Sequence, residues 1–394
     1  MQCSVAACVG TDLEVPTSAY VHLPFCKRKC FYCDFPVVAT GSQLHSAPVQ
    51  DALQAYVALL CREIAATQPV GGAPLRTVFF GGGTPSLIPP PQLARVLDAL
   101  AARFGIAAGA EVSMEADPGT FDALRLREYM ALGVNRFSIG VQAFQQELLE
   151  VCGRSHSLAD VHAALTAVRD AAPAAWSLDL MAGLPGLGAA AWEASLVQAL
   201  AAKPDHISVY DLQVEEGTPF ARWYQPGAAP LPGEGAAADQ LRAASAVLRA
   251  AGYEHYELSS YALPGKRCQH NQVYWAASQP YHAFGLGAAS LLGARRFARP
   301  RAMRAYRAWV EAFVAAGSGV PGGDQPPDSA HEQLLDYVML RLRLSDGLDL
   351  AHMAARFGAA PAAAAAAALA PHVVTGLAEV AAGRSALWGF RGRR

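Results

Sequence analysis

The chain has 394 residues, enough for one barrel-sized domain and a smaller second domain. Lys and Arg (31) nearly balance Asp and Glu (33), which argues against a nucleic-acid surface and favours a small, roughly neutral partner. Apolar runs fall short of the roughly twenty residues that cross a bilayer. The composition therefore predicts no membrane span, and it leaves open a peripheral contact with a membrane surface.

The N-terminal extension, residues 1–19, contains neither Lys nor Arg. This argues against a secretory signal and against an arginine-rich transit peptide. We therefore expect a cytoplasmic protein. A plastid or the mitochondrial matrix is the alternative location if the start of the sequence is incomplete.

Six β-rich runs alternate with helical stretches over the first half of the chain. The predicted strands are Tyr20–Leu23, Thr77–Phe80, Glu111–Glu115, Arg136–Val141, Ser177–Met181 and His206–Tyr210. The predicted helices between them are Gln50–Ala66, Pro91–Phe104, Phe121–Leu132, Leu158–Ala171 and Ala191–Ala202. This alternation implies an α/β fold with a parallel sheet. Six units favour an open, partial (β/α)6 barrel of TIM type, with its site at the carboxyl ends of the strands.

A Gly- and Pro-rich linker, residues 317–327, separates the barrel region, 20–316, from a C-terminal region, 328–394. Apolar residues in His331–Leu344 have helical spacing, and residues 362–368 are all alanine. We therefore expect a smaller, mainly helical second domain.

Three of the eight cysteines form the pattern C-x3-C-x2-C at Cys26, Cys30 and Cys33. Three cysteines at this spacing suit three irons of a [4Fe–4S] cubane and leave the fourth iron free for another ligand. Zinc is the alternative, but zinc usually takes a fourth Cys or His nearby. The sequence therefore predicts a cluster that takes part in substrate chemistry, and no disulfide framework.

The segment from Tyr20 through these cysteines resembles the radical S-adenosylmethionine (SAM) superfamily. Gly81-Gly82-Gly83-Thr84 follows the second predicted strand, where this superfamily presents a glycine-rich edge to the SAM amino group. Further polar residues match, in order, the SAM contacts of the HemN-like branch. The resemblance implies SAM contacts at Tyr20, Tyr32, Gly82, Gly83, Thr84, Glu115, Gln142, Arg154 and Asp179. It leaves the catalytic residues unassigned.

Two groups in this branch share these motifs, the oxygen-independent coproporphyrinogen III oxidases and the heme-binding HemW proteins. Oxidases usually carry a cysteine two residues after the third cluster cysteine, where this chain has Phe35. Oxidases also have a longer extension ahead of the cluster. The sequence is therefore more similar to HemW proteins, which are thought to act as heme chaperones.

The hexapeptide from His270 to Trp275 resembles the HNxxYW motif of HemW proteins. The resemblance implies heme contacts at His270, Asn271, Tyr274 and Trp275. Imidazole is a good ligand of heme iron, and aromatic faces suit a porphyrin. A His-Asn turn with buried aromatic residues is the alternative.

Residues 281–300 are closer to the cyanobacterial and plant form of HemW than to the enterobacterial form. The candidates to pair with heme propionates are Arg295, Arg296, Arg299 and Arg301. A solvated basic face is the alternative reading of these arginines.

The resemblance to the HemN C-terminal domain covers Glu332–Gly358 and fades from about residue 370, so we expect a divergent or truncated tail. We expect a radical SAM [4Fe–4S] protein that binds heme and passes it to an acceptor protein. The alternatives are an oxygen-independent coproporphyrinogen III oxidase of porphyrin biosynthesis, and an iron–sulfur electron-transfer or sensor protein. Whether the chain is an enzyme stays open, and the sequence identifies neither the heme acceptor nor the electron donor.

Overall fold

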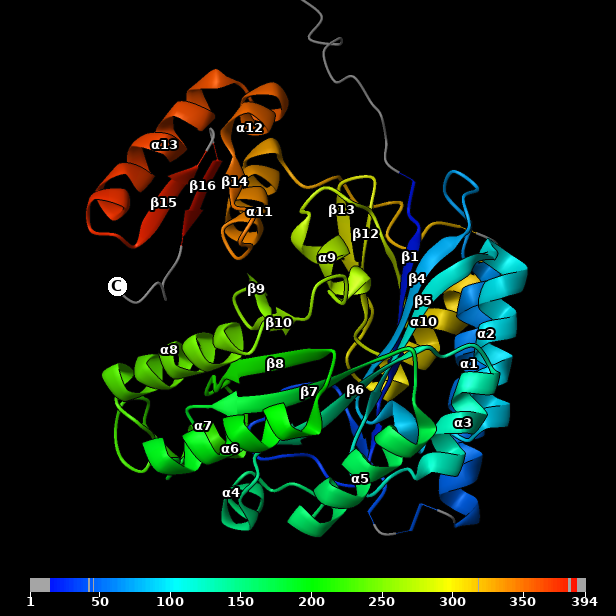
Figure 1. Ribbon diagram of the computed structural model, residues 1–394. Helices are drawn as coiled ribbons and strands as arrows, with labels where there is room; N and C mark the ends of the chain where they lie inside the picture. The colour runs from blue at the N-terminus through cyan, green and yellow to red at the C-terminus, as the bar shows by residue number, and fades with distance from the viewer. Residues whose placement is uncertain (1–14, 42, 45, 318, 382–383, 388–394) are drawn as a thin grey trace, which may run out of the picture.

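Figure 1 presents a computed structural model that describes residues 15–381, apart from 42, 45 and 318, and residues 384–387. A nine-stranded sheet has the order β11-β1-β4-β5-β6-β7-β8-β10-β9. Its parallel centre is formed by β1 (Ser18–Leu23), β4 (Leu75–Gly82), β5 (Ile106–Ala116), β6 (Arg136–Gln142), β7 (Ala175–Ala182) and β8 (His206–Asp211). Each contains one of the six predicted strands, so the parallel α/β fold is confirmed.

Helices follow these strands in chain order. Those along the outer side of the curved sheet are α1 (Ala47–Ala66), α2 (Pro90–Phe104), α3 (Ala123–Ala131), α5 (Leu158–Ala171), α6 (Ala189–Ala202) and α8 (Glu234–Ala250) (Figure 1). The short helices α4 (Gln146–Val151) and α7 (Pro219–Trp223) lie beside the loop that follows β1, where the Phe31 N–H donates to the carbonyl of Cys152 and the Phe220 N–H donates to the carbonyl of Phe31. Local sequence sets their ends. Ser157 and Asp160 form a capping box at the start of α5. Helix α2 begins with prolines and is capped at its C-terminal end by Gly105, which has a φ of 72°.

The central strands alternate between apolar and polar side chains. Met114, Ile139 and Leu178 are fully buried and belong to the main hydrophobic core. The alternate residues form the other face, where Ser138 lies beside Glu115 and Ser177 in the register of the sheet. Parallel strands are usually apolar on both faces. The polar inner face therefore marks the region of the barrel where a site is built.

The chain continues past the sixth unit. β9 (Glu254–Glu257) and β10 (Ser260–Ala262) add antiparallel strands beyond β8, and β11 (His282–Phe284) joins the opposite edge parallel to β1. Helix α9 (Gln269–Trp275) packs against β4 and β5. The remaining elements are β2 (Phe25–Cys26), β3 (Val38–Ala39), the 3-10 helix η1 (Pro85–Leu87), the hairpin β12 (Ala289–Leu292) and β13 (Arg295–Ala298), and α10 (Met303–Ala315).

The C-terminal domain contains α11 (Ala330–Arg341), α12 (Leu350–Phe357) and α13 (Ala359–Val374) around its own small core. It also contains a three-stranded sheet of β14 (Leu348–Asp349), β16 (Arg384–Leu387) and β15 (Ala378–Ala381), which the sequence did not predict. An ion pair between Arg343 and Glu257, with an N–O distance of 2.8 Å, joins this domain to the barrel. Among the described helices, none is long and apolar enough to cross a membrane.

Candidate functional site

The cysteine loop leaves the sheet directly after β1. Cys26 is buried at the end of β2, while Cys30 and Cys33 are partly exposed. The loop folds back on itself, since the backbone N–H of Cys33 donates to the carbonyl of Cys30 at 3.2 Å. Thr84, which follows β4, donates to Cys26 Sγ at 3.5 Å. The structure therefore places Cys26 beside the glycine-rich edge.

The chemistry of the three thiols fits a cationic cluster. Burial raises the pKa of the Cys26 thiol to about 12, and the charges of Cys30 and Cys33 raise it as well. Three thiolates this close are unfavourable unless a metal centre neutralises them. No group of three His, Cys, Asp or Glu in the described residues converges as the ligands of a single metal ion. A cubane instead presents a separate iron to each thiolate.

The glycine-rich edge brings the backbone close to the neighbouring strand. Gly82 has a φ of 114°, and a Cβ there would lie 2.4 Å from the His22 ring. A Cβ on Gly83 would lie 2.6 Å from the backbone of Pro24. Only glycine fits both positions. Glycine at these positions therefore lets this edge pack closely against His22 and Pro24, and its contact with SAM stays a prediction.

Gln142, the last residue of β6, has an unusual backbone conformation. Its φ of 69° is in the left-handed region, which is rare for a residue other than glycine. Its Oε1 atom is buried and has no hydrogen-bond partner in the described part of the chain. Strain of this kind often accompanies a functional site, and a buried acceptor without a donor calls for one. The amino group of SAM is a donor of the required kind.

Two carboxyl groups lie on the polar inner face. Burial raises the pKa of Glu115 to about 7, and the charge of Asp179 adds to this rise. Burial also raises the pKa of Asp179 to about 6, against hydrogen bonds from Ser208 and Ser138 that lower it. Glu115 Oε2 accepts from the Gly82 N–H at 2.9 Å. The raised pKa values mean that a proton or a bound cation at these carboxyl groups is favourable.

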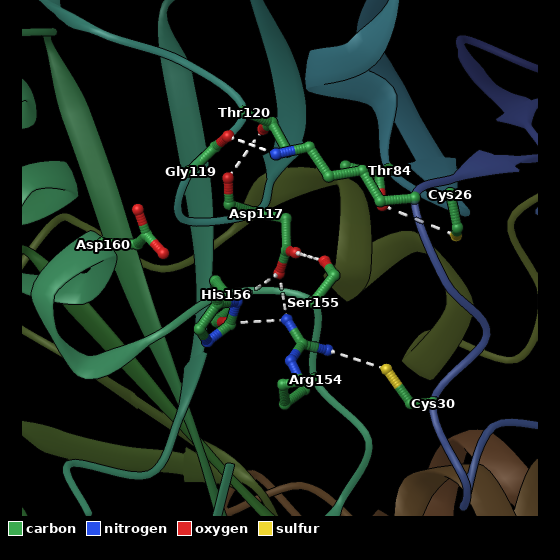
Figure 2. Close-up of polar contacts among 12 residues, drawn as sticks. Cys26, Cys30, Thr84, Asp117, Gly119, Thr120, Arg154, Ser155, His156 and Asp160 are labelled. Carbon is green, nitrogen blue, oxygen red and sulfur yellow. Dashed lines mark hydrogen bonds and ion pairs between the residues drawn. The ribbon is translucent and has the colours of Figure 1, made fainter. Parts of the chain in front are cut away.

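Arg154 connects the cysteine loop to the carboxyl ends of β5 and β6 (Figure 2). It donates to Cys30 Sγ at 3.3 Å, to Tyr32 Oη at 3.1 Å and to the carbonyl of Gly140 at 2.9 Å. It also forms a partly buried ion pair with Asp117. Tyr32 therefore lies beside Arg154. Tyr20, the other tyrosine predicted at this site, lies on β1, where its hydroxyl is 3.0 Å from His22 Nδ1.

The sequence did not identify one residue of this cluster, Asp117. His156 Nδ1 lies 3.3 Å from its carboxylate, on the side away from Cys30. Although burial alone raises the pKa of Asp117, the Arg154 guanidinium and His156 hold it below its ordinary value. An acidic residue directly after a strand was the signal that could have identified it.

The predicted heme motif forms helix α9. His270 is fully buried, with Nδ1 2.8 Å from Thr77 Oγ1 and Nε2 2.8 Å from Tyr274 Oη. Burial lowers its pKa to about 3, so its ring is neutral. Direct ligation of a heme iron by His270 requires breaking one of these two hydrogen bonds. Asn271 is partly exposed and does not line the cavity described next.

A cavity of about 1100 Å³ lies between the barrel and the C-terminal domain. The barrel contributes Tyr20 and Phe35 near the cysteine loop, and Tyr274 and Trp275 from α9. Trp275 Nε1 is buried and has no hydrogen-bond partner in the described residues. The structure thus brings half of the predicted heme motif, together with Phe35 two residues after the third cysteine, to one cavity.

Comparisons with known proteins agree with this arrangement. A model of the radical SAM superfamily matches residues 20–197, and one of the HemN C-terminal domain matches residues 328–387. Heme chaperone HemW of Synechocystis is 48% identical over 87% of this chain and 82% of its own length. HemW of Escherichia coli is 40% identical over 69% of each chain. A zebrafish (Danio rerio) mitochondrial protein, radical S-adenosyl methionine domain-containing protein 1, is 32% identical over 86% of this chain and 75% of its own length.

The structure of coproporphyrinogen III oxidase (HemN) from Escherichia coli superimposes with a TM-score of 0.78. The superposition covers 95% of this chain and 87% of the HemN chain. The sequence identity is 24%, so the likeness concerns the fold alone. The fold and the three-cysteine loop define a radical SAM protein, a class that uses a [4Fe–4S] cluster and SAM. Within this class, the chain belongs to the HemW family. The higher identity to the cyanobacterial relative agrees with the predicted cyanobacterial form.

Proposed function

We propose that the chain binds heme in the cavity between its two domains and passes it to an acceptor protein, acting in the cytoplasm. The observation that carries this proposal is the cavity itself, because Tyr274 and Trp275 line it directly beside the cysteine loop. Aromatic faces and a volume of about 1100 Å³ suit a large flat ligand. The Synechocystis and Escherichia coli relatives carry the name heme chaperone.

The same proposal assigns the cofactor contacts. Cys26, Cys30 and Cys33 would hold the cluster, and the glycine edge beside Cys26 would contact SAM bound next to it. When bound and reduced, the cluster supplies an electron that breaks a C–S bond of SAM. The further SAM contacts are Tyr20, Tyr32, Gly82, Gly83, Thr84, Glu115, Gln142, Arg154 and Asp179.

These side chains have different tasks in the proposed site. Burial raises the pKa of Glu115 and of Asp179, so a SAM cation on the inner face would stabilise the ionised form of both carboxyl groups. Gln142 offers a buried acceptor, Oε1, for which the described residues supply no donor. Arg154 fixes the cysteine loop against the carboxyl ends of two strands. The barrel around them keeps water away from the bound sulfonium.

An oxygen-independent coproporphyrinogen III oxidase is the second candidate function. Its fold is the same, and its substrate is also a tetrapyrrole. Phe35 argues against it, since this ring lines the cavity at the position where oxidases usually carry a cysteine. The side chain is 54% exposed, so it presents an apolar surface to a ligand. An electron-transfer or sensor role needs no such cavity.

Two titrations of the anaerobically reconstituted protein test the proposal. Ferric heme should bind saturably at about one per chain and give a new absorption band. Coproporphyrinogen III, added with SAM and a strong reductant, should give no protoporphyrinogen IX. Conversion of coproporphyrinogen would favour the oxidase. If heme bound without saturation and coproporphyrinogen remained unchanged, the sensor or electron-transfer alternative would gain support.

A further inference from the structure

Two elements of the C-terminal domain form the wall of the cavity opposite α9. Helix α11 contributes Gln333, Asp336 and Leu340, and helix α12 contributes His352 and its neighbours. This wall is more polar than the aromatic wall of the barrel. A ligand that fills the cavity therefore meets flat apolar rings on one side and titratable or charged side chains on the other.

Two histidines line the cavity, and only one has free ring nitrogens in the described residues. His22 lies 3.0 Å from Tyr20 Oη through Nδ1 and 3.1 Å from the Pro36 carbonyl through Nε2. His352 is exposed and makes no ring hydrogen bond in the part of the chain that is described. Its ring stacks on Tyr337, with centroids 5.7 Å apart and an angle of 24°. Stacking holds the imidazole in place while both nitrogens stay available.

Arg356 lies one helical turn after His352, so the two side chains share one face of α12. Its guanidinium lies over the rings of Phe357 and Tyr337, and the described residues offer it no carboxylate partner. The other arginines of the cavity are already paired, Arg296 with Asp336 and Arg301 with Asp34. Among the described residues that line the cavity, Arg356 is therefore the guanidinium that is free to pair with a carboxylate of the ligand.

We propose that His352 is the axial ligand of heme iron in this cavity and that Arg356 pairs with a heme propionate. This inference rests on the proposed function and adds the ligating residue. Neutral imidazole is a common axial ligand of heme iron, and a guanidinium matches the geometry of a propionate carboxylate. The heme joins the two domains, because its rings lie against Tyr274 and Trp275 of the barrel while its iron is held from α12.

Three variants of the full-length chain test the iron ligand. His352→Phe keeps a ring on Tyr337 but has no ligating nitrogen, and His352→Ala leaves space for added imidazole. His372→Phe is the matched control, because His372 is exposed on α13 and does not line the cavity. We expect His352→Phe to lower heme affinity at least tenfold and to shift the absorption band. Imidazole should restore the band of His352→Ala, and His372→Phe should behave as the original chain.

A second pair of variants tests the propionate contact. Arg356→Gln should lower the affinity for heme severalfold and leave the affinity for heme dimethyl ester unchanged, because the ester has no carboxylate. Arg307→Gln is the control, since Arg307 is exposed on α10 and outside the cavity. It should change neither affinity. Equal losses for heme and its ester would contradict a propionate contact.

The outcomes separate this inference from the function on which it rests. If the original chain bound no heme, the proposed function would fail. If the original chain bound heme but His352→Phe kept the same affinity and absorption band, His352 would not be the ligand and the proposed function would stand. Circular dichroism of every variant checks that the exposed substitutions leave the fold intact.

Discussion

Arg154 donates a hydrogen bond to Sγ of Cys30 at 3.3 Å, although the two residues are 124 positions apart in the chain. The same guanidinium forms a partly buried ion pair with Asp117, which follows β5 (Figure 2). Arg154 is therefore held from one side by a carboxylate and presents a positive donor to a cluster cysteine on the other. Both its charge and its N–H groups stabilise extra electron density at that sulfur.

Replacement of Arg154 should lower the reduction potential of the cluster. Arg154→Gln removes a positive charge beside Cys30, so the reduced, more negative cluster loses stabilisation. We expect a shift to more negative potential of roughly 60 mV, since about 1.4 kcal/mol corresponds to 59 mV in a one-electron step. A redox titration followed by electron paramagnetic resonance measures it. Arg125→Gln, at an exposed ion pair on α3, should leave the potential unchanged.

Cluster content should depend on the three cysteines of the loop. Anaerobic reconstitution should give about four irons and four sulfides per chain, and Cys30→Ala should lose most of this content. Cys61→Ala is the matched control, because Cys61 lies on α1 and contacts the carbonyl of Arg95. Iron and sulfide analysis measures the result. An unchanged visible spectrum in a variant lacking all three loop cysteines would contradict the assignment.

The unfolding free energy of the cluster-free protein should respond to pH through Glu115. Its folded pKa of about 7 lies above the ordinary value of 4.5, so the folded state holds this proton more tightly than the unfolded state. This contribution is complete below about pH 4.5 and is lost as the pH rises through 7. Glu115→Gln has no such loss and can still accept from Gly82. Its stability relative to the original chain should rise between pH 5 and pH 8 by on the order of 1–3 kcal/mol.

Urea denaturation at the two pH values checks this expectation. Glu128→Gln, at a partly exposed position on α3, is the control and should show no comparable pH dependence. A Glu115→Gln stability difference that stayed constant with pH would mean that burial does not hold the Glu115 proton.

His270 should act mainly through stability. His270→Ala removes a fully buried ring and leaves Thr77 Oγ1 and Tyr274 Oη without their partner. We expect a loss of about 3 kcal/mol in the free energy of unfolding and an unchanged position of the heme band in protein that remains folded. Gln269→Ala, at an exposed position on the same helix, should cost little. A shifted heme band without loss of stability would identify His270 as an iron ligand.

Much of the barrel could be predicted from the sequence because its strands are short, buried and separated by amphipathic helices. The strand at Arg136–Gln142 was predicted to within one residue. Strand β11 at the edge of the sheet was not predicted, because its pairing with β1 joins residues more than 250 positions apart. The three-stranded C-terminal sheet was also missed, since its strands have two to four residues in an alanine-rich region.

The candidate site likewise contains some residues that the sequence could identify and others that only the structure shows. Cys26, Cys30 and Cys33 lie within eight residues, so their spacing alone indicated a metal cluster. Asp117 gains its role from an arginine 37 positions later, and this contact has no local pattern. His352 lies on the C-terminal domain and reaches the cavity only through the packing of that domain against the barrel.

Filling the cavity tests its role in heme binding most directly. Ala355 and Ala351 are both exposed on α12, but only Ala355 lines the cavity. Ala355→Trp should therefore occupy the space of the heme and lower its affinity at least tenfold, while Ala351→Trp should bind heme as the original chain does. A heme titration followed by absorption measures both variants. Equal, unchanged affinity in the two variants would contradict heme binding in this cavity.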